Sequence, residues 1–178
     1  MSKDYTLRIP SQENVLTYIK NHTTSVRELE KLGGSFWKPI SVSLVDFNPR
    51  DRAVRIRTFS NDKAKAEDII INHDQKAYIT NSELLIEGTT TECENKLSIL
   101  GFEKWVDYTQ FAIEYTIQYQ NITFNALDEI FNDLSTTIKF EADSSEVLQS
   151  FLVQFNIDIN KLENLNTAEL LAKQAGLL

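Results

Sequence analysis

Two arginines at strand spacing are the clearest sign of chemistry in this chain of 178 residues. Arg55 and Arg57 alternate with Val54 and Ile56, a pattern that is typical of a β-strand. Side chains two residues apart on a strand point to the same side, ~6.5 Å apart along the chain. Because a guanidinium group can bind phosphate through two hydrogen bonds, this pair could bind two oxygens of one phosphate chain. The alternative interpretation is that the two arginines simply face solvent or pair with carboxylates.

Acidic residues on the polar faces of predicted strands form the second candidate set. Hard divalent cations such as Mg²⁺ take oxygen ligands and bridge to substrate phosphates, so two such carboxylates near the arginines could hold a metal. The alternative interpretation is ordinary cross-strand ion pairing with arginines and lysines. The members of this set are Asp4, Glu83, Glu87, Glu114 and Glu141.

The other reactive residue types are scarce. One cysteine, Cys93, excludes a disulfide framework and a cysteine-based zinc site. Two histidines, His22 and His73, exclude a histidine-rich metal site and support no Ser-His-Asp arrangement. The sequence also contains no glycine-rich loop of the kind that binds nucleotides or dinucleotides.

The overall charge of the chain is acidic. Lysine and arginine number 18 against 26 aspartates and glutamates, so the formal net charge is −8. An acidic surface repels phosphate backbones, and nucleic acid is therefore not an expected partner. No run reaches the ~18 apolar residues of a membrane span, and the first residues show no apolar signal segment. We expect a cytoplasmic protein that binds a small ligand and contacts no membrane, with a homodimer left open.

Alternation of apolar and polar residues, together with turn residues, predicts eight strands and five helices. Strands joined by short turns favour antiparallel pairing. The expected fold class is α+β, an antiparallel β-barrel or tunnel with helices packed outside, in a single domain over residues 1–178. The predicted strands are Tyr5–Ile9, Ile40–Val45, Ala53–Arg57, Lys76–Thr80, Glu83–Glu87, Val106–Tyr119, Ile122–Ala126 and Thr137–Glu141, and the predicted helices begin at Ser11, Ser25, Thr91, Asp143 and Asn166.

Turn and capping residues mark the ends of these elements. We expect Gly33 and Gly34 to end the second helix, and we expect turns at Asn81-Ser82, within a hairpin, and at Gln120-Asn121. Capping boxes are expected for Asp143 with Glu146 and for Asn166 with Glu169. The polar segments 59–75 and 128–136 are left without a predicted element.

The order of these segments resembles that of the CYTH family, also called triphosphate tunnel enzymes, from about Asp4 to Leu171. Val54-Arg-Ile-Arg57 is similar to the family's Leu-Arg-Ile-Arg strand. Ile99-Leu-Gly-Phe102 is similar to its helix ending in Leu-Gly-Phe, and Leu165-Asn-Thr-Ala-Glu-Leu-Leu171 is similar to its C-terminal helix. The family includes class IV adenylate cyclases and thiamine and inorganic triphosphatases.

The resemblance implies a tunnel that binds a triphosphate-containing or other phosphorylated ligand. In the family, inward basic residues hold the phosphates and inward glutamates bind Mg²⁺ or Mn²⁺. The metal then supports attack on phosphorus by water or by a ribose hydroxyl. In this chain, the phosphate-binding positions so implied are Arg8, Arg55, Arg57 and Lys76, and the metal-binding positions are Asp4 and Glu141.

Two acidic motifs of the family are incomplete in this chain. The opening Glu-x-Glu-x-Lys corresponds to Asp4, Thr6 and Arg8. The final Glu-x-Glu corresponds to Lys139 and Glu141, so that a cation stands at a metal-ligand position. Like charges ~4 Å apart cost about 4 kcal/mol at an effective dielectric constant of about 20, which would weaken a metal site severely if Lys139 points inward.

Three functions therefore stay open. The first is a divalent-metal-dependent triphosphate hydrolase or nucleotidyl cyclase. The second is a catalytically inactive tunnel-fold module that binds a phosphorylated ligand with Arg8, Arg55 and Arg57. The third is a protein-interaction domain that uses the acidic outer surface. The surviving arginines support the first two functions, and the incomplete acidic motifs argue against the first.

Overall fold

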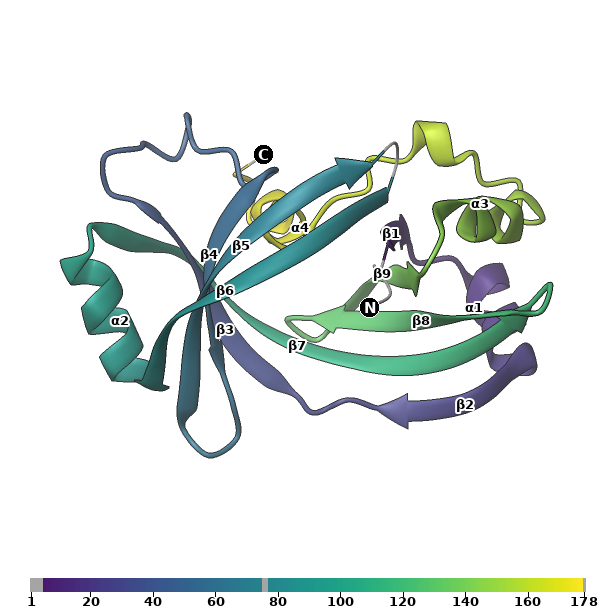
Figure 1. The fold of residues 1–178 in the computed structure, drawn as a ribbon, viewed down its shortest axis with the longest axis horizontal. Helices are drawn as coiled ribbons and strands as arrows, with labels where there is room; N and C mark the ends of the chain where they lie inside the picture. The colour runs from purple at the N-terminus through teal and green to yellow at the C-terminus, as the bar shows by residue number, and fades with distance from the viewer. Residues whose placement is uncertain (1–4, 75–76, 178) are drawn as a thin grey trace. The chain divides into compact units, whose positions relative to one another are not determined.

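A computed structural model describes residues 5–74 and 77–177 of the chain (Figure 1). Within these residues it contains nine strands, four α-helices and one short 3₁₀ helix. The strands are β1 Tyr5–Pro10, β2 Thr23–Glu28, β3 Leu32–Pro39, β4 Arg52–Thr58, β5 Lys63–Asp74, β6 Ala77–Thr89, β7 Phe102–Tyr119, β8 Ile122–Phe131 and β9 Leu134–Ala142. The helices are α1 Glu13–His22, α2 Thr90–Ile99, α3 Ser145–Val153, η1 Ile159–Lys161 and α4 Thr167–Gln174.

The nine strands of the described residues belong to one mostly antiparallel sheet. Its order is β2-β7-β3-β4-β5-β6-β1-β9-β8, and β7 also pairs with β8. The pairings therefore return to β7 after passing through seven other strands, and β2 lies outside this circuit. The expected fold class, α+β with an antiparallel sheet and helices packed outside it, is confirmed.

The chain divides into two compact units. The first contains the described residues of Met1–Glu30, His73–Ile79 and Gln110–Asn164. The second contains the described residues of Lys31–Asn72, Thr80–Thr109 and Leu165–Leu178. Each unit has its own cluster of buried hydrophobic side chains.

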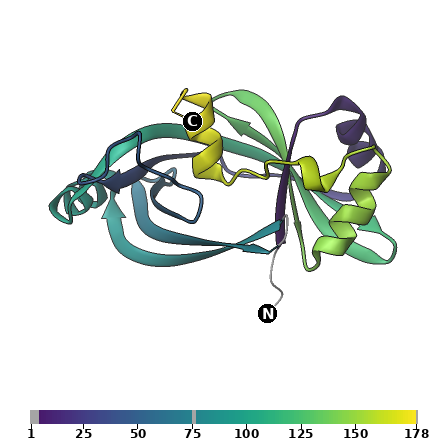
Figure 2. The ribbon, with the colours of Figure 1, turned by 90° about the horizontal axis from the view of Figure 1, so that it is seen from above.

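Alternating residues of β1 and β9 build the core of the first unit. Leu7 and Ile9 on β1 are fully buried, as are Ile138 and Phe140 on β9. The antiparallel register places Leu7 opposite Phe140 and Ile9 opposite Ile138, so these side chains share one face. Helices α1 and α3 add buried residues to the same core and lie beside these strands in Figure 2. The alternation leaves Arg8 on the opposite face of β1.

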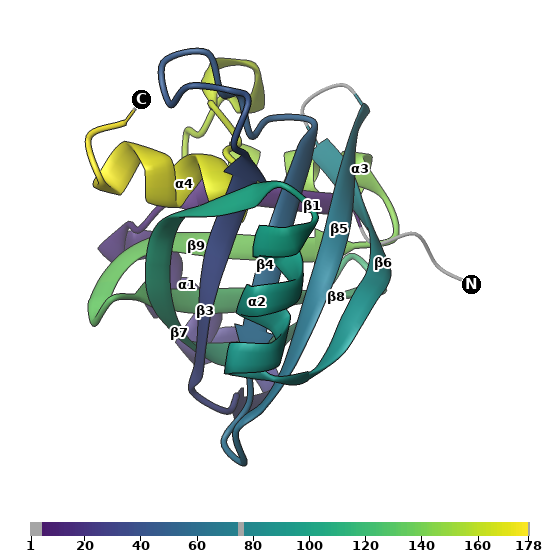
Figure 3. The same ribbon diagram turned by 90° about the vertical axis from the view of Figure 1, so that its left-hand side faces the viewer.

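Helix α2 covers one face of the sheet in the second unit. Figure 3 shows it lying across β3, β4 and β5. Its buried residues Cys93 and Leu97 belong to a cluster with Val54 and Ile56 of β4. Because successive side chains of a strand point to opposite faces, Arg55 and Arg57 lie on the side away from α2.

Two expected elements between residues 23 and 47 are wrong. The helix expected to begin at Ser25 is strand β2, followed by β3, and the segment Ile40–Val45 forms turns and bends instead of a strand. Gly33 and Gly34, expected to end that helix, pair with β4 inside β3. The helical spacing of apolar residues after Ser25 does not correspond to a buried face, since Val26 is 56% exposed. Pairing with distant strands decided the conformation of this segment.

The hairpin expected around Asn81 and Ser82 is also wrong, because β6 continues through both residues. Residues 59–75 showed no clear pattern, yet most of them form β5, which pairs along β4. A capping box was expected at Asp143 ahead of α3. The N-cap is Ser144 instead, and its side chain makes no capping hydrogen bond.

Local signals succeeded where the interaction itself is local. Asn166 and Glu169 form the expected capping box at the start of α4. The expected turn at Gln120 and Asn121 joins β7 to β8, with φ of 50° and 62° at the two residues. No helix within the described ranges combines the length and apolar composition that crossing a bilayer requires.

Candidate functional site

Arg55 and Arg57 share one face of β4 with two residues of the neighbouring strand, as their spacing predicts. The register of β4 and β5 places Arg55 opposite Glu67 and Arg57 opposite Lys65. Directly opposed residues point to the same side of a sheet, so all four side chains lie together. We call these four residues, Arg55, Arg57, Lys65 and Glu67, the arginine face.

Glu67 bridges the two guanidinium groups of the arginine face. Arg55 Nη2 donates to Glu67 Oε2 at 2.7 Å, and Arg57 Nη2 donates to Oε1 at 3.1 Å and to Oε2 at 3.4 Å. Burial raises the pKa of Glu67, but the hydrogen bond from Arg55 and the charges of both arginines outweigh it, so the pKa lies below its ordinary value. This carboxylate is therefore ionised at neutral pH.

The arginine face keeps an excess of positive charge and of hydrogen-bond donors. Three cations and one carboxylate give the arginine face a formal net charge of +2. Its Lys65 Nζ lies 4.0 Å from Oε1 of the exposed Glu87, so that pair neutralises it only weakly. The Nε atoms of Arg55 and Arg57 are buried and have no hydrogen-bond partner among the described residues. The side chain of Arg55 is 16% exposed. Of the alternative interpretation, pairing of the arginines with a carboxylate is therefore present, while the side chain of Arg57 is 33% exposed.

Aromatic rings border the arginine face. Phe36 lies opposite Arg55 on β3 and stacks on Tyr108 of β7, with 5.3 Å between ring centroids. The ring of Phe59 lies 5.7 Å from Cζ of Arg57. Tyr108 is buried, and burial raises the pKa of its hydroxyl, which stays protonated at neutral pH. Such apolar borders lower the local dielectric constant and strengthen charged contacts with an anion.

Gly34→Ala is expected to lower the free energy of unfolding by about 1–3 kcal/mol. A Cβ at this position would lie 2.6 Å from the carbonyl oxygen of Ile56 and 2.7 Å from the ring and hydroxyl of Tyr108. Relief requires a backbone shift of β4, which also displaces the arginines. Gly33→Ala is the matched control, because the nearest atom to its Cβ is the Tyr108 carbonyl oxygen at 4.0 Å. Urea denaturation compares the two variants, and equal losses would contradict the steric argument.

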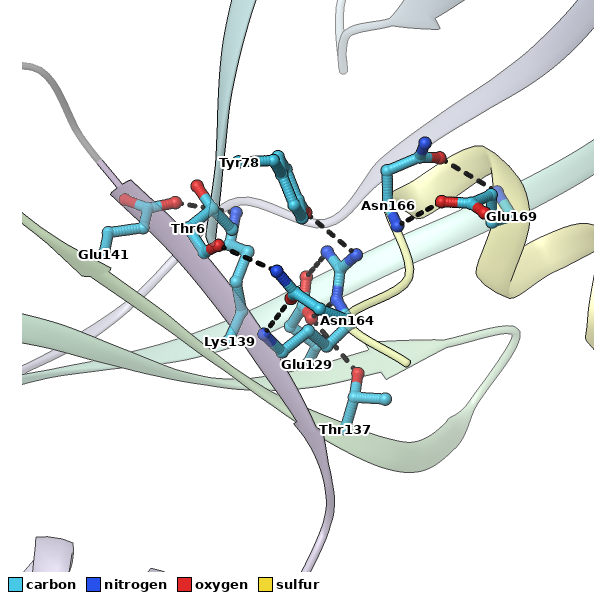
Figure 4. A network of polar contacts seen from close by, with 10 residues as sticks. Thr6, Tyr78, Glu129, Thr137, Lys139, Glu141, Asn164, Asn166 and Glu169 are labelled. Atoms are coloured by element: carbon cyan, nitrogen blue, oxygen red, sulfur yellow. Dashed lines mark hydrogen bonds and ion pairs between the residues drawn. The ribbon is translucent and has the colours of Figure 1, made fainter. Parts of the chain in front are cut away.

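Arg8 lies in the first unit, where it forms a buried ion pair with Glu129 of β8, which Figure 4 labels together with Tyr78 and Thr137. Its Nε donates to Glu129 Oε1 at 2.7 Å and its Nη2 to Oε2 at 3.1 Å, a bidentate arrangement. The hydroxyl of Tyr78 accepts from Nη1 at 3.2 Å, and Thr137 donates to Glu129 Oε1 at 3.1 Å. Glu129 is fully buried and Arg8 is 3% exposed. The guanidinium group predicted to bind phosphate is thus engaged by a carboxylate of the chain itself.

The two charges of this pair stabilise each other in their ionised forms. Burial alone would lower the pKa of Arg8, but the charges of Glu129 and Tyr78 and the hydrogen bonds to both residues together outweigh it, so the pKa is raised. Burial would raise the pKa of Glu129, but the charges of Arg8 and Lys139 and the hydrogen bond from Arg8 lower it below its ordinary value. The pair is therefore fully charged at neutral pH.

Asn164 holds the backbone of β1 beside this ion pair, as Figure 4 shows. Its Oδ1 accepts from the backbone N–H of Arg8 at 2.7 Å, and its Nδ2 donates to the carbonyl oxygen of Thr6 at 3.3 Å. Asn164 adopts a left-handed φ of 48°, which asparagine tolerates better than most residues. This contact, 156 residues apart in sequence, fixes the strand that carries Arg8.

Of the two residues predicted to hold Mg²⁺ or Mn²⁺, Glu141 is the one that the structure describes, and its surroundings disfavour a cation. Glu141 lies on β9, and Lys139 Nζ donates to its Oε1 at 2.7 Å, so a cationic side chain already neutralises this carboxylate. No group of three His, Cys, Asp or Glu side chains suited to a metal occurs within residues 5–74 and 77–177. Asp4, the other predicted metal ligand, and Lys76, a predicted phosphate ligand, lie outside the described residues.

Sequence reasoning missed the two carboxylates that define these groups. Glu67 lies in a segment without a predicted element, and Glu129 lies in a stretch expected to be polar and irregular. The available signal was indirect. Arginines on a strand of an acidic chain are expected to pair with carboxylates, but the spacing does not say which ones. The identity of those partners depends on cross-strand register, which local patterns do not specify.

The comparisons with known proteins concern the fold. No family model and no curated protein matches the sequence. Among solved structures, the PH1819 protein from Pyrococcus horikoshii OT3 has a TM-score of 0.68 at 16% identity, over 96% of this chain and 99% of that chain. HpAC1 from Hippeastrum, an adenylyl cyclase candidate described as having a dominant triphosphatase activity, has a TM-score of 0.57 at 11% identity, over 100% and 97% of the two chains.

A candidate adenylate cyclase from Vibrio parahaemolyticus gives a similar result, with a TM-score of 0.58 at 11% identity over 96% of this chain and 98% of that chain. At such identities the likeness establishes the fold and nothing finer. The chain therefore has a CYTH-like fold, as the resemblance of its motifs implies, and its ligand and activity require arguments from its own residues.

Proposed function

We propose that this chain binds a phosphorylated anion through Arg55 and Arg57. The observation that carries the proposal is the convergence of two partly buried guanidinium groups on one oxyanion, the carboxylate of Glu67, while both buried Nε–H donors stay without a partner among the described residues. Guanidinium groups match phosphate oxygens in geometry, and charge-assisted bonds in a shielded site are strong. The net positive charge of the arginine face provides attraction within an acidic molecule.

We further propose that binding does not depend on Mg²⁺ or Mn²⁺. The support is the engagement of Glu141 by Lys139 and of Glu129 by Arg8, which leaves neither carboxylate available as a simple metal ligand. A second candidate function, metal-dependent hydrolysis or cyclisation of a triphosphate, draws its support from the fold shared with HpAC1. The two functions differ in one readout, the release of phosphate or pyrophosphate.

Arg55→Ala and Arg57→Ala are each expected to weaken the binding of inorganic tripolyphosphate by about 10- to 100-fold, because each removes charge-assisted hydrogen bonds of about 1.5–3 kcal/mol. Arg52→Ala is the matched control. It removes an arginine of the same strand whose side chain is 66% exposed and pairs with Asp68 on the α2 side. Isothermal titration calorimetry in EDTA measures the affinities, and thermal shift with tripolyphosphate, ATP and thiamine triphosphate ranks the ligands.

Equal affinity of Arg52→Ala and Arg55→Ala would contradict the assignment of the arginine face. Binding that requires Mg²⁺ or Mn²⁺, with release of phosphate or pyrophosphate from the same ligands, would favour the enzyme. Failure of every anion to bind the unmodified chain would reject both proposals and favour a protein-interaction domain.

A further inference from the structure

Glu67 occupies the position that an anionic ligand of the arginine face would need. Its two oxygens accept from Nη2 of both arginines, at 2.7 Å from Arg55 and at 3.1 and 3.4 Å from Arg57. A phosphoryl group bridging the same guanidinium groups would require those donors for itself. The side chain of Glu67 is 10% exposed, so its carboxylate cannot become hydrated unless it moves away from the arginines. Ligand and carboxylate therefore compete for the same donors.

We propose that Glu67 is an internal competitor for the anion site and selects ligands of high negative charge. The inference rests on the proposed function of the arginine face. A monovalent anion would only exchange one unit charge for another and would still have to move the carboxylate. A polyphosphate brings several charges and more acceptor oxygens, enough to engage the Nη donors and the buried Nε–H groups together. Glu67 would thus set the threshold of charge that a ligand must carry.

The surroundings of Glu67 favour such an exchange. The groups that face it are Arg55 and Arg57 from β4, Lys65 from its own strand and Tyr108 from β7. Three of these are cations, so an incoming polyanion meets net positive charge even while Glu67 is in place. The neighbouring carboxylate, Asp68, pairs with Arg52 on the opposite face of the strand and takes no part.

Glu67→Gln tests the inference directly, because the amide keeps the shape of the side chain and removes its charge. We expect this variant to bind inorganic tripolyphosphate at least ~10-fold more tightly than the unmodified chain, since the arginines no longer leave a charge-assisted carboxylate bond. It should also bind inorganic phosphate measurably, so that the ratio of tripolyphosphate affinity to phosphate affinity becomes smaller than in the unmodified chain. Asp68→Asn is the matched control: an adjacent arginine-paired carboxylate converted to its amide, with an expected change below about 3-fold. Calorimetry in EDTA measures all three proteins.

The outcomes separate this inference from the proposed function. Tripolyphosphate binding that depends on Arg55 and Arg57 but is unchanged or weakened in Glu67→Gln would overturn the inference and leave the proposed function intact. A gain in Glu67→Gln that persists after Arg55→Ala would contradict both. A gain of equal size in Asp68→Asn would reduce the effect to net charge and overturn the specific role of Glu67.

A measurement on the unmodified chain keeps the inference testable if Glu67→Gln folds poorly. The arginines hold the pKa of Glu67 below its ordinary value, and an anion that displaces the carboxylate removes this stabilisation and raises the pKa. Binding is then coupled to proton uptake, so affinity increases as the pH falls from about 5 towards about 3, through the ordinary range of a glutamate carboxyl. Sulfate is the suitable probe because it keeps its charge over this range. A sulfate affinity that does not increase on acidification would overturn the displacement of Glu67.

Discussion

Glu129→Gln is expected to lower the free energy of unfolding by about 3–5 kcal/mol, the usual cost of breaking a buried ion pair from one side. Arg8 is 3% exposed and would retain its charge without the carboxylate that accepts from its Nε and Nη2. The hydroxyl of Thr137 would lose its charged acceptor as well. Urea denaturation followed by circular dichroism measures the loss.

The control is Glu114→Gln, which breaks an arginine–glutamate pair with a single hydrogen bond at the surface. Arg27 Nη2 lies 2.9 Å from Glu114 Oε1, but the side chain of Arg27 is 67% exposed. Exposed pairs contribute about 0–1 kcal/mol, so the control should lose little. Equal losses in the two variants would show that burial does not set the strength of the Arg8–Glu129 pair.

The same pair predicts how stability depends on pH. Because the folded-state pKa of Glu129 lies below its unfolded value, the stabilisation is complete above about pH 4.3 and is lost as the pH falls towards the folded pKa. The difference between the unmodified chain and Glu129→Gln should therefore shrink in acid. A difference that stays constant from pH 7 to about pH 3 would contradict the lowered pKa.

Phe151→Ala is the second substitution with a large expected effect, a loss of about 3–5 kcal/mol in the free energy of unfolding. Phe151 of α3 is fully buried at the centre of the first unit's hydrophobic core. Removing its ring leaves a cavity, and the neighbouring rings, which come from one helix, three strands and the loop after α3, cannot all move to fill it. Its ring neighbours, at centroid distances of 5.1–5.8 Å, are Tyr18, Tyr119, Phe124, Phe140 and Phe155.

Val153→Ala provides the control on the same helix, since Val153 is 66% exposed and leaves no cavity. We expect a change within about 0.5 kcal/mol for this surface substitution. The midpoint and slope of urea denaturation compare the variants. A loss below about 1 kcal/mol for Phe151→Ala would show that α3 collapses onto β9 and β8 and closes the cavity, contrary to the close packing described.

Short-range geometry explains which parts of the site were predictable. Side chains on a strand repeat every two residues, so the common side of Arg55 and Arg57 follows from the alternation of Val54 and Ile56 alone. The capping box of Asn166 and Glu169 spans three residues and is equally local. The order of short motifs along the chain also indicated the CYTH-like fold. That order can be read without knowing which strands pair with one another.

The partners of the charged residues could not be obtained in this way. Arg55 and Glu67 are 12 residues apart, and Arg8 and Glu129 are 121 residues apart, so each pair exists only through strand register. The motif positions that suggested a phosphate ligand at Arg8 and a metal ligand at Glu141 do not reveal the internal partners Glu129 and Lys139. A shift of one residue in register would turn these side chains to opposite faces.

The amino-acid sequence thus suffices for the local elements β1, β4, α2 and α4, for the shared face of two arginines and for the class of fold. It does not reveal that β2 and β3 replace an expected helix, nor that a carboxylate already lies between the arginines. Both depend on pairing between segments far apart in the chain, where burial and hydrogen bonding outweigh local preference. The balance of charge in the site, and with it the class of ligand proposed, is therefore a property of the folded chain.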